Sequence, residues 1–220
     1  MRLLTLLMIA FIARPQTGDQ GEEFRQFIAK IHTAMGLKTG SVVADVGTGD
    51  SVDHPTHITR AIGPAGKLVC EDIDDSALKK LAAKLKEAGM DNVEFVLGEP
   101  DNPKLPAHAF DSIIISNAYH EFTDPRPMLD HIRKALKPGG KLVILEAITQ
   151  KMRNQTRNEQ VKVHELAPAL LERELASSEK SVGCRYGRIV PGSPARVACE
   201  PTAGWLGVGF FRSQLPFEPV

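Results

Sequence analysis

Cysteine, net charge and long apolar runs are scarce in this sequence, and each scarcity excludes a class of protein. Three cysteines in 220 residues are too few, and odd in number, for a disulfide framework. The 27 basic and 27 acidic residues cancel, so no net charge draws the chain to nucleic acid or to an anionic membrane. We therefore expect no nucleic-acid partner and no stable membrane span, which takes about 20 apolar residues.

The composition that is present is that of a globular domain. Hydrophobic residues make up 42% of the chain and charged residues 25%, as in ordinary folded domains. One α/β domain accounts for a chain of this length, and it would bury roughly 70% of its unfolded surface without cross-links.

The N-terminus has two interpretations. Met1-Arg2 precedes an apolar run from Leu3 to Ala13, and a positive charge before a short apolar stretch is typical of a signal peptide. Phe11 would occupy the minus-three position of a cleavage site after Ala13, where small residues are favoured. The alternative is a helix packed on the domain. Retention of this leader places the protein in the cytoplasm, and cleavage places it in the periplasm or outside the cell.

Strands and helices alternate along residues 22–175. Apolar, β-branched segments predict strands, amphipathic segments predict helices, and residues 15–21 form a polar linker. The expected strands are 41–46, 67–70, 93–97, 110–116 and 141–148, and the expected helices are 22–35, 56–62, 76–88, 127–136 and 160–175. This order predicts an α/β fold with a doubly wound, mostly parallel sheet and helices on both faces.

The last 45 residues differ from this pattern. They hold 11 of the 33 glycine and proline residues, and apolar periodicity fades after Leu175, returning only at 205–211. Residues 176–220 therefore either complete the sheet in an irregular way or are not the natural ending of the domain.

The most informative motif is Asp45-Val46-Gly47-Thr48-Gly49, where the first expected strand runs into a turn. Glycine lets the backbone turn sharply and approach a ligand closely. Dinucleotide sites favour uncharged glycine turns that cradle a pyrophosphate. A carboxylate at Asp45 would repel phosphate, so the turn suits a ligand with a cationic amino group.

Polar residues also follow the next three expected strands. Asp72 ends the second strand, where a carboxylate can accept both hydroxyls of a ribose. Glu99 and Pro100 follow the third strand, in position to meet the edge of an adenine. Asn117 follows the fourth strand, at the sheet edge where ligands of open α/β folds bind.

In order and spacing these features resemble class I S-adenosylmethionine (SAM)-dependent methyltransferases, which have a Rossmann-like fold. The likeness is close over residues 41–148 and includes the segments 110–114 and 136–142. His164-Glu165-Leu166-Ala167-Pro168 resembles a bacterial subgroup of unassigned substrate. The resemblance implies SAM as the cofactor and a small molecule as the methyl acceptor.

The resemblance also implies roles for the matched positions. The methionine end of SAM would lie at the glycine turn, the ribose at the end of the second strand, and the adenine after the third. In that order, these positions are Asp45, Gly47, Thr48 and Gly49; Asp72 and Ile73; and Glu99 and Pro100. Asn117 would contact the cofactor through its backbone.

One position departs from the family pattern. Asp50 or Ser51 stands where the family usually has a third glycine. This departure keeps open a second hypothesis, a SAM-fold protein that binds a ligand without catalysis. A third hypothesis, a nicotinamide-dependent oxidoreductase, is disfavoured because its Gly-x-Gly-x-x-Gly turn is absent.

His120, with Tyr119 and Glu121 beside it, is the best candidate for positioning the acceptor or removing its proton. A base is needed only where the acceptor must lose a proton, as a phenol or an alcohol does. The alternative is that His120 packs in a loop and bonds to backbone. His164-Glu165 is a second acceptor-side candidate, with a helix-surface pair as its alternative.

Two further histidines lie beside the glycine turn without forming a metal motif. Pro55 separates His54 from His57, and their spacing matches no rigid zinc site. The sequence therefore predicts no metal site.

Overall fold

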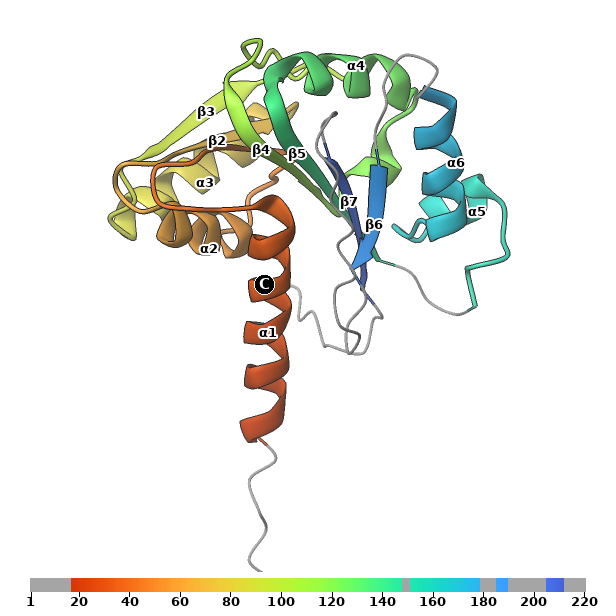
Figure 1. The fold of residues 1–220 in the computed structure, drawn as a ribbon, viewed down its shortest axis with the longest axis horizontal. Helices are drawn as coiled ribbons and strands as arrows, with labels where there is room; N and C mark the ends of the chain where they lie inside the picture. The colour runs from red at the N-terminus through yellow and green to blue at the C-terminus, as the bar shows by residue number, and fades with distance from the viewer. Residues whose placement is uncertain (1–16, 148–150, 179–184, 190–204, 212–220) are drawn as a thin grey trace, which may run out of the picture.

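Seven strands form one sheet in the computed structural model, which describes residues 17–147, 151–178, 185–189 and 205–211. The strand order is β3-β2-β1-β4-β5-β7-β6, and each neighbouring pair is parallel. The strands are β1 (Val42–Val46), β2 (Lys67–Asp72), β3 (Val93–Leu97), β4 (Phe110–Ser116), β5 (Leu136–Ala147), β6 (Arg185–Ile189) and β7 (Trp205–Phe211). The predicted Rossmann-like α/β fold is confirmed (Figure 1).

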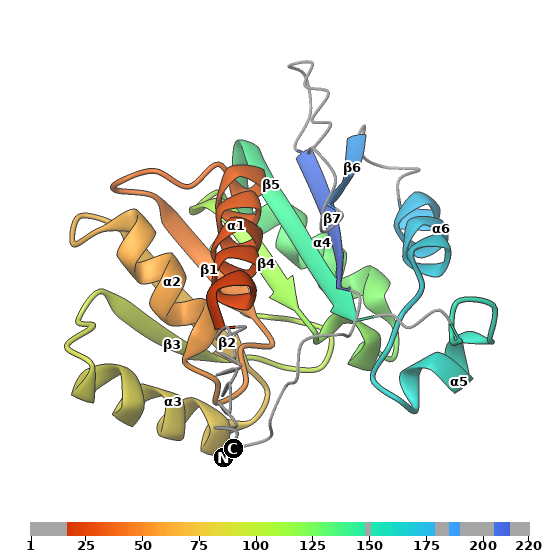
Figure 2. The same ribbon diagram turned by 90° about the horizontal axis from the view of Figure 1, so that it is seen from below.

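Helices pack on both faces of the sheet (Figures 1 and 2). They are α1 (Thr17–Met35), α2 (Asp53–Ile62), α3 (Asp75–Glu87), α4 (Pro125–Ala135), α5 (Arg157–Val161) and α6 (Pro168–Ser178), with the 3-10 turn η1 (Tyr119–Glu121). None of these described helices has the length and apolar character needed to cross a membrane.

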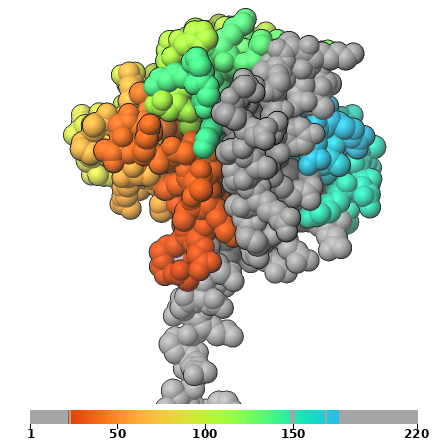
Figure 3. Space-filling view, viewed as in Figure 1, coloured from red at the N-terminus to blue at the C-terminus, as the bar shows by residue number. Residues whose placement is uncertain are grey.

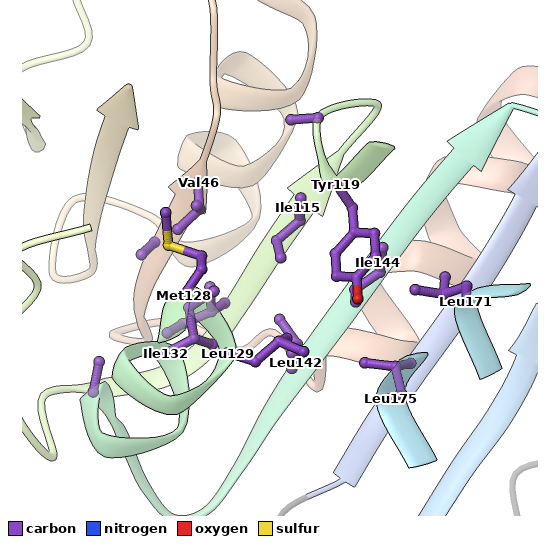
Figure 4. Close-up of a cluster of buried hydrophobic side chains, with 14 of the residues drawn as sticks. Val46, Ile115, Tyr119, Met128, Leu129, Ile132, Leu142, Ile144, Leu171 and Leu175 are labelled. Carbon is purple, nitrogen blue, oxygen red and sulfur yellow. The ribbon is translucent and has the colours of Figure 1, made fainter. Parts of the chain in front are cut away.

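Alternation along the buried strands separates two layers of core. Successive side chains of a strand point to opposite faces. Val43 of β1 and Ile114 of β4 therefore pack with α1, α2 and α3. Ala44 and Ile115, one position further along, pack with α4 and α6. Figure 4 shows part of this second layer. Because both faces are covered, the central strands are almost entirely apolar.

Side chains at the helix starts explain where three helices begin. Asp74 accepts a hydrogen bond of 2.8 Å from the backbone of Ser76 at the start of α3. Asp124 accepts one from Arg126 at the start of α4, and Thr156 accepts one from Glu159 at the start of α5. Each cap satisfies a backbone N–H that the helix itself leaves unpaired.

Besides shifts of up to three residues at other helix and strand ends, the structure differs from the sequence expectations in three larger ways. Residues 17–21 of the expected linker belong to α1. β5 begins at Leu136, because Leu136 pairs with Phe110 before the ladder shifts register at Ser112. The single helix expected over 160–175 is two helices, separated by a turn in which His164 has a φ of 55°. A β-carbon makes this conformation unfavourable inside a helix.

Both ends of the chain carried expectations of their own. The apolar run from Leu3 to Ala13, and with it the signal-peptide hypothesis, lies outside the described residues. From the tail, β6 and β7 continue the sheet beyond β5.

Helix α1 joins the core through one apolar stripe. Phe27, Ile28, Ile31, Ala34 and Met35 are all at most 8% exposed and pack over the centre of the sheet. The preceding turns of α1 extend beyond the body of the domain (Figures 1 and 3). The helix is therefore a structural part of the domain.

We expect Ile31→Ala to lower the free energy of unfolding by about 2–5 kcal/mol, because it leaves a cavity under a side chain that is only 1% exposed. Gln26→Ala, on the exposed side of the same helix, is the control and should change stability by less than about 0.5 kcal/mol. Urea denaturation measures both values. Equal, small effects would show that α1 does not stabilise the domain.

Candidate active site

The functional residues predicted from the sequence gather where β1 to β5 end. In the order β3-β2-β1-β4-β5, the chain adds β2 and β3 on one side of β1 and then β4 and β5 on the other side. The direction in which strands are added therefore reverses between β1 and β4. Ligands of open α/β sheets bind at such a switch point, beyond the carboxyl ends of the strands. The loops after β1, β2, β3 and β4 meet there.

The glycine turn after β1 is held by backbone hydrogen bonds to β2. Gly47 and Thr48 both donate to the carbonyl oxygen of Glu71, over 2.9 and 3.0 Å. Gly47 and Gly49 have φ values of 70° and 61°, which glycine adopts without strain. A β-carbon on Gly47 would lie 2.5 Å from Cβ of Ala118. The turn therefore lies directly against the loop that follows β4.

Asp45 places a carboxyl group beneath this turn. Its side chain is 2% exposed, and Oδ2 accepts a hydrogen bond of 3.0 Å from the Thr48 hydroxyl. Oδ1 has no hydrogen-bond partner among the described residues. Burial raises the pKa of Asp45 to about 7. A buried acceptor of this kind is stabilised by a ligand that brings a donor or a positive charge.

Asp72 links the glycine turn to the start of α3. One carboxylate oxygen accepts from the backbone of Gly49 over 2.8 Å, and the other accepts from the backbone of Asp74 over 2.9 Å. A carboxylate offers about four lone-pair positions, so Asp72 can accept further hydrogen bonds from the two hydroxyls of a ribose.

Two exposed aliphatic side chains flank this carboxylate. Ile73 is 58% exposed and Leu97 is 47% exposed, and Leu97 pairs with Asp72 in the parallel ladder. Large apolar residues at the carboxyl ends of neighbouring strands form a surface suited to a planar base. The sequence assigned Ile73 to the site and missed Leu97, which looks like one more apolar residue of a strand.

Glu99, Pro100 and Asn117 lie on the exposed rim of the site. Glu99 pairs with Asn102 through backbone hydrogen bonds, and its carboxylate is 2.7 Å from Nζ of Lys104. Asn117 has a φ of 53° and donates its N–H to Leu145 over 2.8 Å. Its left-handed conformation turns the chain sharply after β4.

Asp50, which with Ser51 is one of the two candidates for the position of the third glycine, is exposed and contacts Lys84 of α3. Nζ of Lys84 donates to the Asp50 carbonyl over 2.8 Å and lies 3.7 Å from its carboxylate. Nearby, His54 contacts the Ser116 hydroxyl at 3.0 Å. His57 instead packs edge-on against Phe24 of α1. His54 and His57 thus have separate surroundings.

Of the three candidate side chains in the loop after β4, His120 and Glu121 converge. His120 is 1% exposed, and its Nδ1 lies 2.8 Å from a carboxylate oxygen of Glu146 at the end of β5. Its Nε2 lies 3.2 Å from Nδ1 of His164. The Glu121 carboxylate is 65% exposed and lies 3.7 Å from the same Nε2. The structure thus brings together the two acceptor-side candidates, His120 and His164, from loops 44 residues apart.

Tyr119 points into the core and away from this group. Its ring lies against Phe122, with centroids 5.4 Å apart, and within the hydrophobic layer that contains Ile144 and Leu171 (Figure 4). Burial raises the pKa of its phenol above the usual value, so the hydroxyl stays neutral.

Glu71 and Glu146 are two further buried acids that the sequence interpretation missed. Glu71 is 1% exposed, and its Oε1 occupies the space where a side chain on Gly98 would lie. Burial raises the pKa of Glu71 to about 8. Glu146 is fully buried and accepts from both the backbone and the ring of His120. A signal was available, because each acid directly follows an apolar run, 68–70 before Glu71 and 142–145 before Glu146.

Residues 20–181 match the model of the ubiE/COQ5 methyltransferase family. The chain belongs to this family. A ubiquinone/menaquinone biosynthesis C-methyltransferase UbiE from Cronobacter sakazakii is 38% identical over 114 residues, which are 50% of this chain and 44% of that protein. This ubiE/COQ5 family member therefore spans less than half the length of that curated relative.

Solved structures confirm the fold of this ubiE/COQ5 family member. A SAM-dependent methyltransferase from Aquifex aeolicus has a TM-score of 0.60 and 22% identity, covering 73% of this chain and 87% of that one. The [4+2]-cyclase SpnF has a TM-score of 0.57 and 19% identity, covering 72% of this chain and 58% of that one. A fold that carries both proteins does not by itself determine an activity.

Asp45 should make the stability of this ubiE/COQ5 family member depend on pH. Its pKa is about 7 in the folded state and about 3.9 when unfolded, so the folded state holds the proton more tightly. The stabilisation is complete below about pH 4 and is lost as pH rises through about 7. At about 1.4 kcal/mol per pKa unit, the loss reaches at most about 4 kcal/mol.

Chemical denaturation of the wild type and of Asp45→Asn between pH 4 and pH 8 measures this effect. The asparagine keeps an acceptor for Thr48 but does not titrate, so the difference between the two unfolding free energies should fall across this range. Parallel curves would show that Asp45 ionises normally.

Proposed function

We propose that the protein transfers a methyl group from SAM to a small-molecule acceptor. The observation that carries this proposal is the buried Asp45 carboxyl beneath the glycine turn, with an oxygen unpartnered among the described residues. A SAM ammonium group would supply both the donor and the positive charge that this oxygen lacks. Membership of a methyltransferase family supports the same cofactor.

The neighbouring residues fit the rest of the cofactor. Asp72, fixed by two backbone donors, would accept the ribose hydroxyls. Ile73 and Leu97 would cover the two sides of the adenine, with Glu99 and Pro100 at its edge. A β-carbon on Gly49 would meet no described atom within 4 Å, so this turn leaves open space for the methionine part.

Once bound, SAM supplies an electrophilic methyl group on a sulfonium, and the protein has to orient the acceptor and exclude water. His120 is suited to the acceptor side, because its loop contacts the glycine turn through Ala118 and Gly47. The Glu146 carboxylate fixes the orientation of the imidazole. The other ring nitrogen of His120, Nε2, lies 3.2 Å from Nδ1 of His164 and would take a proton of the acceptor or bind a group that positions the acceptor.

Small-molecule methylation is the part of the relatives' function that we extend to this protein. UbiE relatives are named for C-methylation in quinone biosynthesis. The match covers 44% of such a protein. In this chain, His164 and Glu146 contact His120 on the proposed acceptor side. We therefore propose only that the acceptor is a small molecule that His120 can approach.

A SAM-fold binding protein without catalysis remains the second candidate. Its support is the turn at Asp50 and Ser51, where the family usually has a third glycine and where Lys84 contacts Asp50. Isothermal calorimetry with SAM and with NAD separates the candidates. Binding of SAM and turnover support the enzyme, SAM binding without methyl transfer to any acceptor supports the binding protein, and binding of NAD alone supports an oxidoreductase.

Asp72→Ala should weaken SAM binding by about 1–3 kcal/mol, because it removes charged hydrogen bonds to the ribose. Asp75→Ala, three residues further along at the exposed start of α3, is the matched control and should bind SAM as the wild type does. Calorimetric titration of both variants measures the effect. Unchanged affinity in Asp72→Ala would remove its ribose role.

His120→Ala should lower turnover at least about a hundredfold, the usual contribution of a positioned acid or base, and change SAM affinity less than about twofold. Transfer of label from methyl-labelled SAM to a panel of phenols, enols and amines measures turnover, and calorimetry measures affinity. His108→Ala, on an exposed loop before β4, is the control. A larger effect on SAM affinity than on turnover would place His120 on the cofactor side.

A further inference from the structure

Three side chains from two distant loops direct potential ligand atoms at one point. They are His120 and Glu121 of η1 and His164 of the turn between α5 and α6, and their ligand atoms all lie within 4.8 Å of one another. We propose that these residues bind a divalent transition-metal ion, with zinc as the best match. The sequence analysis weighed only His54 and His57 as metal ligands and predicted no metal site, whereas 44 residues separate His120 from His164.

The spacing of the two imidazoles agrees with a zinc site. Nε2 of His120 and Nδ1 of His164 are 3.2 Å apart. In a tetrahedral site with Zn–N bonds of about 2.0–2.1 Å, the ligand nitrogens are about 3.3 Å apart. The Glu121 oxygen lies 3.7 and 3.9 Å from these nitrogens. Because this side chain is 65% exposed, a small rotation closes the remaining distance.

Glu146 provides the outer partner that metal-binding histidines commonly have. Such a histidine usually donates its second ring N–H to a carboxylate, which fixes the ring and makes the ligating nitrogen more basic. Nδ1 of His120 lies 2.8 Å from the Glu146 carboxylate, and both side chains are at most 1% exposed. With Nδ1 protonated, the lone pair of Nε2 points at His164.

The charges of the group favour a divalent cation. Two carboxylates, Glu146 and Glu121, lie on either side of two imidazoles that are neutral as metal ligands. A buried carboxylate is costly unless it is paired or lies near a metal. One divalent ion would balance both carboxylates, whereas a single proton on the imidazoles balances only one of them.

The surrounding chain holds His164 in place. Arg157 of α5 donates to the carbonyl oxygen of Phe122, directly after η1, over 3.2 Å. Gln160, fully buried, accepts from the backbone of Ala167 and donates to that of Gln155. His164 keeps a left-handed φ of 55°, a conformation that costs energy for a residue with a side chain. These contacts fix the second loop against the first.

Three protein ligands leave a coordination position for water or substrate, as in catalytic zinc sites. His164 and Glu121 are 71% and 65% exposed, so this position would open to solvent. This step rests on the proposed methyl transfer. In that reaction, the ion would bind an oxygen of the acceptor and lower the pKa of that oxygen. The acceptor class would then be a phenol or an enol.

Metal-free full-length protein, prepared with a chelator and titrated with Co²⁺ alone, tests the site. We expect one Co²⁺ per chain with visible absorption bands of low-coordinate cobalt, displaced by Zn²⁺. His164→Ala and Glu121→Ala, both changes at exposed side chains, should weaken Co²⁺ binding more than tenfold. Glu146→Gln should weaken it about 10–100-fold through the outer partner, and His108→Ala should leave it unchanged.

Two results would overturn the metal site. One is wild-type protein that binds no Co²⁺ with such bands, and the other is equal Co²⁺ binding by the wild type and His164→Ala. Either result would mean that hydrogen bonds, with a proton shared between the imidazoles and the carboxylates, hold these side chains together without a metal ion. Calorimetry with SAM on the metal-free protein keeps the two proposals separate, because SAM binding tests the methyltransferase proposal without requiring the ion.

Discussion

Close contact between Gly47 and Ala118 determines the geometry of the whole site. A β-carbon on Gly47 would lie 2.5 Å from that of Ala118, far inside van der Waals contact, so the first position of the turn has to be glycine. The contact joins the loop after β1 to the loop after β4, across the point where the winding of the sheet reverses. The residues proposed to bind SAM and the residues proposed to face the acceptor therefore meet at this contact.

Buried acids concentrate at the same edge of the sheet, and burial gives each of them a different environment. Asp45 and Glu71 have raised pKa values because burial disfavours their charged forms. Glu146 is as deeply buried but accepts two hydrogen bonds from His120. Apolar side chains of similar size at these positions would often make a protein equally or more stable. Their positions, each at or next to the end of a strand, favour ligand binding as the reason for the cost.

Local patterns were sufficient to predict strands β1 to β5, but not β6 and β7, and to select the residues of the proposed cofactor half of the site. Apolar strands and glycine turns are short-range signals, and Asp45, Gly47 and Asp72 each lie at the end of a strand that the pattern identifies. The helix expected over 160–175 was wrong because its apolar spacing continues through residues whose backbone turns left-handed at His164. The early start of β5 depends on pairing with Phe110, which no local pattern contains.

The acceptor half depended on contacts between segments far apart in the chain. His120 was identifiable as a candidate, but its partners come from β5 and from the turn after α5. Tyr119, its neighbour in sequence, points into the hydrophobic layer under α6, because adjacent residues of a tight turn face different directions. The acceptor side is thus built by the packing of the α5–α6 segment on η1.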